Sequence, residues 1–368
     1  MTQAAVLTAL GQPLELRDDV DLEAPHAGEV RVKVLATGVC HSDLSMRDGV
    51  LPVTLPAVLG HEGSGVVTEV GPGVTSVAKG DHVVISWVPQ CGTCFYCSRG
   101  QAHLCQEADI ALVTGGLLDG TPRFRWREGP VYQMCGCGTF ATETVVLATA
   151  AVPVPDDLDP AVAALLGCGV VTGVGAALNT ATIAEGDAVA VLGCGGVGLN
   201  VIQGARIAEA GTIIAIDANP SKLALAEAMG ATTTVDASRI DPVSAVMTST
   251  AERGADVAFE VVGLGPTIDQ AIAMTRRGGQ TVLVGLPSID VMLQLPAWVG
   301  LILQHKTIKG CWYGSADLRR DIPRLVDLYR TGDLQVDALV SQRIGLADVN
   351  AAFDAMVAGE GARSVIVF

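Results

Sequence analysis

Basic residues are scarce in this sequence of 368 residues. Its 23 lysines and arginines are outnumbered by 39 aspartates and glutamates, which gives a formal net charge of −16 at pH 7. No segment rich in lysine and arginine offsets this balance locally. Because a chain of this charge repels polyphosphate backbones and anionic membrane surfaces, we expect neither a nucleic acid nor a membrane as its partner.

An export signal is also missing from the first residues. The start of the chain has no basic stretch followed by an apolar segment and a cleavage site. We therefore expect a cytoplasmic protein, and in a reducing cytosol its ten cysteines stay free of disulfides. Metal binding or redox chemistry is then the expected use of those cysteines that cluster.

A long uncharged run at 161–179 is a candidate for a membrane-spanning helix. Its length would allow a helix to cross a bilayer. The run contains four glycines, at 167, 169, 173 and 175, and each disfavours a regular helix by about 1 kcal/mol. A buried, bent segment in a globular core is therefore the better interpretation.

The length and the hydrophobic pattern predict two domains, because a single core usually stops growing at roughly 250–300 residues. The first half consists of short β segments between Gly/Pro turns, such as 29–34 and 65–71, which is typical of an all-β, barrel-like domain. From about residue 187, apolar strands alternate with helix-length segments, as in a doubly wound parallel sheet. We expect strands at 188–192, 212–216, 256–261, 280–284 and 363–368, and helices at 197–210, 221–229, 242–251, 267–276, 321–329 and 346–357.

The segment at 193–198 fits the GxGxxG pattern of dinucleotide-binding folds. The pattern alone is weak in a chain with 43 glycines, but here a predicted strand precedes it, a predicted helix follows it, and Asp217 ends the next strand. Asp217 would accept hydrogen bonds from the adenosine ribose and repel a 2′-phosphate, so we expect NAD rather than NADP. The alternative is a tight turn in a cofactor-free domain. The glycines that would let the backbone approach the pyrophosphate are Gly193, Gly195, Gly196 and Gly198.

Four cysteines, Cys91, Cys94, Cys97 and Cys105, form the pattern C-x2-C-x2-C-x7-C. Four thiolates at this spacing can surround zinc tetrahedrally, and such a shell leaves no open position for a substrate. The pattern therefore predicts a structural zinc site. An iron–sulfur cluster and unliganded buried thiols are the alternatives.

Five motifs occur in the order in which zinc-dependent medium-chain alcohol dehydrogenases carry them. They are Gly-Val-Cys-His-Ser-Asp at 38–43, Gly-His-Glu-Gly-Ser-Gly at 60–65, the four-cysteine segment, Leu-Gly-Cys-Gly-Val-Val-Thr-Gly at 166–173, and the glycine pattern at 193–198. The sequence resembles that family from end to end. It is most similar to the liver-type and glutathione-dependent formaldehyde dehydrogenase branch, because Asp-Gly-Thr-Pro-Arg-Phe at 119–124 resembles part of the long loop of that branch.

The resemblance implies the fold and the domain boundaries. It implies a GroES-like, β-rich catalytic domain over 1–170 and 311–368, with a Rossmann NAD-binding domain over 171–310. It also implies two zinc ions per chain, the second one catalytic. Without the resemblance, the dispersed residues Cys40, His61 and Cys168 would each be assigned to ordinary buried or hydrogen-bonded positions.

The resemblance implies that Cys40, His61 and Cys168 bind the catalytic zinc and leave one position open for the oxygen of the substrate. Asp43 would orient the imidazole of His61 by accepting its other ring proton. Glu62 corresponds to a carboxylate near the metal that is sometimes implicated in ligand exchange. The implied activity is reversible hydride transfer between a primary alcohol and NAD, which gives the aldehyde.

Further roles follow from position in the family. Ser42 corresponds to the hydroxyl residue that takes the proton of the alcohol. A histidine continues this relay in liver-type enzymes, but Ser45 stands there in this chain, so the route by which the proton leaves stays open. The implied cofactor contacts are His41, Thr172, Val197, Lys222 and Arg363, and the implied substrate pocket contains Trp87, Ile110, Met134 and Leu286.

That pocket is apolar, which favours apolar or aromatic alcohols. The alternatives are a thiol-dependent formaldehyde dehydrogenase, a nicotinoprotein with tightly bound NAD(H), and, outside the enzymes, a catalytically silent homologue. Family members in this branch are usually dimers, and the apolar segment 283–303 could join two subunits. We expect a homodimer, with a tetramer as the alternative.

Overall fold

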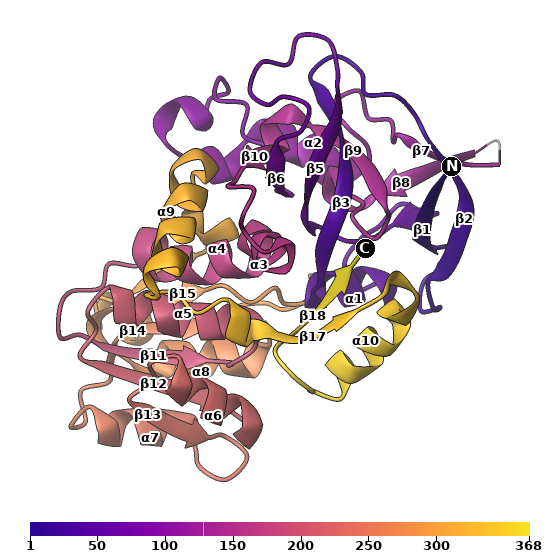
Figure 1. The fold of residues 1–368 in the computed structure, drawn as a ribbon. Coiled ribbons are helices and arrows are strands. Elements are labelled where there is room, and N and C mark those ends of the chain that lie inside the picture. Colours follow the sequence, from indigo (N-terminus) through magenta and orange to yellow (C-terminus); the bar gives the residue numbers. More distant parts are fainter. Residues whose placement is uncertain (128) are drawn as a thin grey trace. The chain divides into compact units, whose positions relative to one another are not determined.

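The computed structural model of this chain describes residues 1–127 and 129–368. These residues form two compact units. Unit 1 comprises Met1–Gly169 and Asp317–Phe368, and unit 2 comprises Val170–Ala316. Unit 1 thus combines the indigo and purple start of the chain with its yellow end in Figure 1.

Unit 1 is built mainly of two β-sheets. One is a closed barrel in the order β1-β2-β7-β8-β4, and the other has the order β10-β6-β5-β3-β18-β17, with β9 paired to β3. The β-rich first half predicted from sequence is confirmed. The strands are β1 (Thr2–Leu7), β2 (Glu15–Leu22), β3 (Glu29–Val39), β4 (Ala57–Val58), β5 (Glu62–Val70), β6 (His82–Ile85), β7 (Phe124–Trp126), β8 (Gly129–Gln133), β9 (Glu143–Leu147), β10 (Ala151–Pro153), β17 (Val340–Ile344) and β18 (Arg363–Val367).

The C-terminal tail belongs to unit 1 through its last strand. β18 pairs antiparallel with β3, from Ser364 opposite Val39 to Val367 opposite Ala36, and parallel with β17. The α-helices of the unit are α1 (His41–Arg47), α2 (Gln106–Thr114), α3 (Pro160–Leu165), α9 (Leu318–Thr331) and α10 (Val349–Val357). At the start of α3, the Asp159 carboxylate accepts a hydrogen bond from the Ala161 amide, and Pro160 takes the first helical position.

Unit 2 contains a six-stranded parallel sheet in the order β13-β12-β11-β14-β15-β16. Its strands are β11 (Ala188–Leu192), β12 (Thr212–Asp217), β13 (Thr233–Asp236), β14 (Ala255–Glu260), β15 (Thr275–Leu283) and β16 (Thr307–Gly310). Its α-helices are α4 (Val171–Gly175), α5 (Gly196–Ile207), α6 (Pro220–Ala228), α7 (Pro242–Ser249) and α8 (Gly265–Met274). The predicted doubly wound fold is confirmed. The edge strands β13 and β16 escaped prediction because each has at most one buried residue, so neither forms an apolar run.

The uncharged run belongs to a continuous helical segment, Pro160–Thr180. It consists of α3, a π-helical turn at Leu166–Val170, α4, and a second π-helical turn at Ala176–Thr180. By length and composition alone this segment could span a membrane, but 89% of its most apolar window is buried. Such burial is typical of a core helix in a globular protein. The expected burial is therefore observed, although the glycines do not interrupt the helix.

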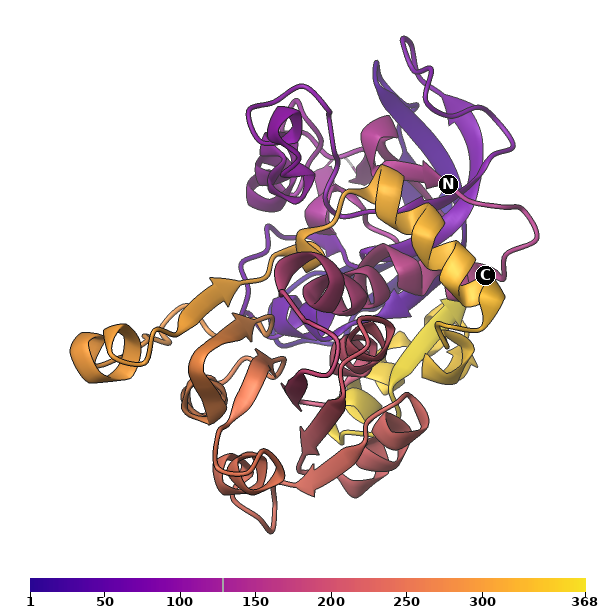
Figure 2. The same ribbon diagram turned by 90° about the vertical axis from the view of Figure 1, so that its left-hand side faces the viewer.

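A segment between β15 and β16 extends away from the sheet of unit 2. It contains the π-helical turn Ala297–Ile302, none of whose residues is buried. Figure 2 shows this orange turn projecting from its neighbours at the far left. We call residues 286–304 the arm.

Candidate active site

Neighbouring elements of unit 1 bring four side chains with metal-binding atoms together. Cys40 follows β3, His61 directly precedes β5, Glu62 is the first residue of β5, and Cys168 lies in the π-helical turn after α3. Because Gly38 in β3 is paired with Glu62 in β5, Cys40 and His61 meet where the strands end. One possible ligand atom from each of the four residues lies within 4.8 Å of the others, and all four residues are buried.

Asp43 holds this cluster in place. Its carboxylate lies 3.1 Å from Nδ1 of His61 and accepts hydrogen bonds from the amides of Cys40, at 2.8 Å, and Gly60, at 3.0 Å. An Nδ1 that faces a carboxylate leaves Nε2 free for a metal. Burial opposes the charged imidazole, but Asp43 and Cys40 outweigh this effect and raise the pKa of His61 well above its usual value.

The two thiols of the cluster behave as a pair. A hydrogen bond with Cys168 lowers the pKa of Cys40 well below its usual value, against the effect of burial. The same hydrogen bond, together with burial, raises the pKa of Cys168. Thiols bind a metal as thiolates, so a cation bound here would displace the protons of this pair.

Glu62 is a buried carboxylate beside this pair. Neither of its oxygens has a hydrogen-bond partner among the described residues, and the Arg363 guanidinium lies 3.5 Å away. Burial raises the pKa of Glu62 to about 7, although Arg363 opposes the shift. Two thiols, an imidazole oriented through Nδ1, and a carboxylate without a hydrogen bond fit a divalent metal such as zinc.

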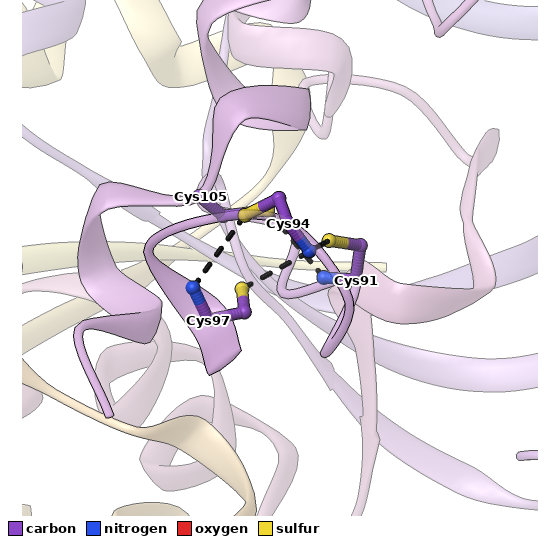
Figure 3. A group of neighbouring side chains, drawn as sticks. All are labelled: Cys91, Cys94, Cys97 and Cys105. Atoms are coloured by element: carbon purple, nitrogen blue, oxygen red, sulfur yellow. Dashed lines mark hydrogen bonds between the residues drawn. The ribbon is translucent and has the colours of Figure 1, made fainter. Parts of the chain in front are cut away.

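The other four cysteines form a separate cluster in unit 1, shown in Figure 3. Cys91, Cys94, Cys97 and Cys105 also place their sulfur atoms within 4.8 Å of one another. Backbone amides point at these sulfurs: those of Thr93 and Cys94 donate to Cys91 at 3.4 and 3.3 Å, and that of Cys91 donates to Cys105 at 3.4 Å. Such donors stabilise thiolates, so this cluster fits a closed four-sulfur zinc site.

Unit 2 carries the glycine turn at the carboxyl end of β11. A Cβ at Gly198 would lie 1.8 Å from the carbonyl oxygen of Gly193, whereas a Cβ at Gly195 would meet nothing within 4 Å. The backbone of the turn is therefore closely packed at Gly198 and accessible at Gly195, and a pyrophosphate needs such an accessible stretch of backbone to approach. Asp217 ends β12 and already accepts hydrogen bonds from the amides of Cys194 and Asn219, both at 2.8 Å.

The predicted cofactor contacts are divided between the two units. His41, at the start of α1, and the buried Arg363 belong to unit 1, where Arg363 faces Glu62. Thr172 and Val197 belong to unit 2, in the packed helices α4 and α5. The Thr172 hydroxyl is buried without a hydrogen-bond partner in the described chain. Lys222 lies in α6, close enough to influence the thiol of Cys194 electrostatically.

The predicted proton acceptor Ser42 places its hydroxyl 3.9 Å from the sulfur of Cys40. Among the predicted pocket residues, the Trp87 ring meets the His61 ring edge to face, with centroids 6.5 Å apart, and Met134 shares an apolar cluster with Trp87. Ile110 lies partly exposed on α2 outside that cluster, and Leu286 belongs to unit 2. The roles of these residues stay predictions.

Two features of the site were missed from sequence. Burial raises the thiol pKa of Cys135, which follows Met134, to about 11. Cys135 also lies close enough to His61, Asp43 and Cys40 for their charges to affect this pKa. The contact of Arg363 with Glu62 joins residues about 300 positions apart. No local spacing signals either contact.

Comparisons with known proteins agree with this architecture. The family described as "Alcohol dehydrogenase GroES-like domain" matches residues 26–156, and that described as "Zinc-binding dehydrogenase" matches residues 196–331. A curated relative from Paracoccus denitrificans, named S-(hydroxymethyl)glutathione dehydrogenase, is 38% identical over all of both chains. An "Alcohol dehydrogenase class-3" from Cereibacter sphaeroides is 40% identical, again over all of both chains.

Solved structures also show similarity to alcohol dehydrogenases. The crystal structure of benzyl alcohol dehydrogenase from Acinetobacter calcoaceticus matches with a TM-score of 0.94 and 34% identity, covering 100% of this chain and 99% of that one. The chain is thus an oxidoreductase and belongs to the zinc-dependent, NAD-using medium-chain alcohol dehydrogenase family, in the branch of the glutathione-dependent formaldehyde dehydrogenases.

Proposed function

We propose that this chain oxidises a hydroxymethyl carbon by two electrons, with loss of a hydride and a proton, at the cluster of Cys40, His61 and Cys168. A primary alcohol would give the aldehyde, and an S-hydroxymethyl adduct would give the S-formyl thioester. The observation that carries the proposal is the geometry of this cluster, in which Asp43 faces Nδ1 of its histidine, His61, and leaves Nε2 for a metal. Cys40, His61 and Cys168 would hold a zinc ion, which would supply a Lewis acid for the oxygen of the substrate, and bound NAD would supply the hydride acceptor. The buried surroundings exclude water from the cluster.

Ser42 is the residue that we assign to the first proton transfer. Its hydroxyl lies 3.9 Å from the sulfur of Cys40, beside the residues that would hold the zinc, and this position would suit it to take the proton of an alcohol. Ser42 would receive the proton of the alcohol while it passes its own hydroxyl proton on, so the relay must end in a base. We assign no such role to Ser45, because a serine side chain is not a base near neutral pH.

For the substrate, we propose the S-hydroxymethyl adduct of formaldehyde with a low-molecular-weight thiol as the first candidate. The names of the curated relatives, which match over the full length of the chain, support this class over simple primary alcohols. The second candidate is an apolar or aromatic primary alcohol. It is supported by the apolar side chains of Trp87 and Met134 beside the cluster and by the similarity to benzyl alcohol dehydrogenase.

A rate assay with NAD on protein of measured zinc content separates the two candidates. We expect formaldehyde oxidation to depend on added thiol, and we would compare glutathione, an anion, with the neutral thiol N-acetylcysteamine. Benzyl alcohol, ethanol and NADP complete the panel. Turnover of benzyl alcohol without any thiol-dependent oxidation of formaldehyde would favour the second candidate. No turnover of any substrate at two zinc ions per chain would contradict the proposed function.

We further propose that the chain forms a homodimer through the arm. Large apolar side chains of the arm are exposed, including those of Ile289, Met292, Trp298 and Ile302. Exposed apolar surface of this kind is typical of subunit interfaces. A tetramer is the alternative assembly.

A further inference from the structure

A cavity lies on unit 2 at the edge of its sheet opposite the glycine turn. The strands of this sheet are parallel, and the glycine turn and Asp217 lie at the carboxyl ends of β11 and β12. The cavity is lined instead by residues at the amino ends of β14, β15 and β16, by residues of α7 and α8, and by the arm. Its volume of about 770 Å³ is typical of sites for small molecules.

Basic side chains gather in this cavity, although the chain as a whole is strongly acidic. The lining includes Arg253, Arg276, Arg277 and Lys306. Arg276 is already paired with Asp256. The guanidinium groups of Arg253 and Arg277, in contrast, have no ion pair or hydrogen bond among the described residues. Their charges are therefore available to a ligand.

The Lys306 ammonium is held at the cavity by a carbonyl group and not by an acid. It is partly buried and donates to the carbonyl oxygen of Ile272, near the end of α8, at 2.6 Å. Burial lowers the pKa of Lys306, and no acid of the described chain offsets this effect. An ammonium group has three donors, so it keeps two for a ligand, and an anion would compensate its charge.

The backbone around these cations departs from regular structure. The register between β14 and β15 shifts after Thr275, so that Arg276 and Arg277 lie in a bulge. Bulges redirect side chains and occur often beside functional sites. Glu252 and His305, each directly before a basic residue of the lining, have left-handed φ angles of 62° and 51°. Residues other than glycine keep this conformation only where the surrounding structure holds them, and they cluster at functional sites.

The chemistry of the lining indicates a ligand with one negative charge and an apolar body. Two acids, Glu252 and Asp269, also line the cavity. Three unpaired cations against two acids leave a single positive charge, which suits a monoanion and disfavours a polyphosphate. The apolar part of the lining comes from Ile272 of α8 and from Leu295 and Val299 of the arm.

We propose that this cavity is a second small-molecule site, which binds a monocarboxylate with an apolar body, such as an arylalkanoate. Arg253, Arg277 and Lys306 provide the positive charge for the carboxylate, and the apolar side chains of α8 and the arm cover the rest of the ligand. The site lies within unit 2. It does not depend on the proposed function, because none of its residues belongs to the cysteine clusters or to the glycine turn.

Calorimetry with 4-phenylbutanoate on the zinc-loaded protein tests this site without any turnover. We expect one molecule to bind per chain. The neutral analogue 4-phenylbutanamide should bind at least tenfold more weakly, because it lacks the charge that the three cations would pair with. Equal affinity for the two compounds would overturn the proposal.

Substitutions of exposed arginines locate the bound carboxylate. Arg253→Ala and Arg277→Ala should each raise the dissociation constant about tenfold, because each removes a charged donor. Arg277→Lys keeps the charge and should retain most of the affinity. Arg239→Ala is the control, because Arg239 is 80% exposed and lies outside the cavity, and it should change the dissociation constant by less than twofold.

Three outcomes of these measurements would overturn the proposal. One is that 4-phenylbutanoate does not bind, and another is that wild type, Arg253→Ala and Arg277→Ala bind it equally, as at a site elsewhere in the chain. The third concerns the double variant Trp298→Glu, Ile302→Glu, in which the proposed dimer contact of the arm is broken. If only this variant took up the ligand, a second chain would fill the cavity in the wild-type protein.

Discussion

Asp43 shows how much of the active site depends on one side chain. It contacts Cys40, Gly60 and His61 at once, so a single carboxylate fixes two segments of backbone and the orientation of the imidazole. From sequence, family resemblance predicts only the contact of Asp43 with the histidine. The two backbone contacts required the structure, because they depend on how the end of β3 meets the chain before β5.

Ser42 and Ser45 provide a matched pair for testing the proton relay. Both lie in α1, but Ser42 places its hydroxyl beside Cys40. We expect Ser42→Ala to lower kcat by roughly tenfold or more, because it removes the group that takes the proton of the alcohol. Ser45→Ala should change kcat little. Equal effects of the two substitutions in the same rate assay would contradict the assignment.

At the scale of elements, a buried ion pair connects the barrel of unit 1 to its second sheet. The Arg123 side chain, just before β7, is 1% exposed and donates to the carboxylate of Glu29 in β3 at 2.9 Å. Its guanidinium also donates to Asp119, at 2.9 Å. Burial opposes the charged form of that carboxyl, but hydrogen bonds from Thr121 and the contact with Arg123 outweigh this effect and hold its pKa at about 2. The motif at 119–124, which indicated the family, thus has a structural role.

Arg123→Met tests that role, with Arg125→Met as the control. Removing one partner of a buried ion pair leaves the other charge without compensation, so we expect the free energy of unfolding to fall by about 3–5 kcal/mol. Arg125 also pairs with an acid, Glu23, but its side chain is 48% exposed, and its loss should cost no more than about 1 kcal/mol. Denaturant titration followed by fluorescence measures both values, and similar losses would contradict the interpretation.

At the scale of the whole molecule, the arm is the part of unit 2 with the most unpartnered apolar surface. Trp298 is 70% exposed and Ile302 is 63% exposed. If the arm joins two copies, the double variant Trp298→Glu, Ile302→Glu should be monomeric, because it would bury two uncompensated charges in the interface.

Light scattering of the purified proteins measures this change. Val113→Glu is the control, because Val113 is 79% exposed on α2, outside the arm, and its substitution should leave the mass unchanged. A wild-type protein with the mass of one chain would contradict the homodimer, and a mass of four chains would favour the tetramer.

The sequence alone determined those features that depend on neighbouring residues. The inner strands of unit 2, β11, β12, β14 and β15, and the helices α5 to α8 follow from local hydrophobic periodicity. The glycine turn follows from GxGxxG followed by Asp217, and the four-cysteine cluster from a spacing that spans fifteen residues. Each of these patterns involves residues that are close in sequence, so the local conformation of the chain is enough to bring them together.

Only the tertiary structure decided the contacts between distant segments. Cys40, His61 and Cys168 meet because β3 pairs with β5 and a core helix packs on both, and Arg363 reaches Glu62 because β18 pairs with β3. From sequence, this cluster was accessible through family resemblance and not through spacing.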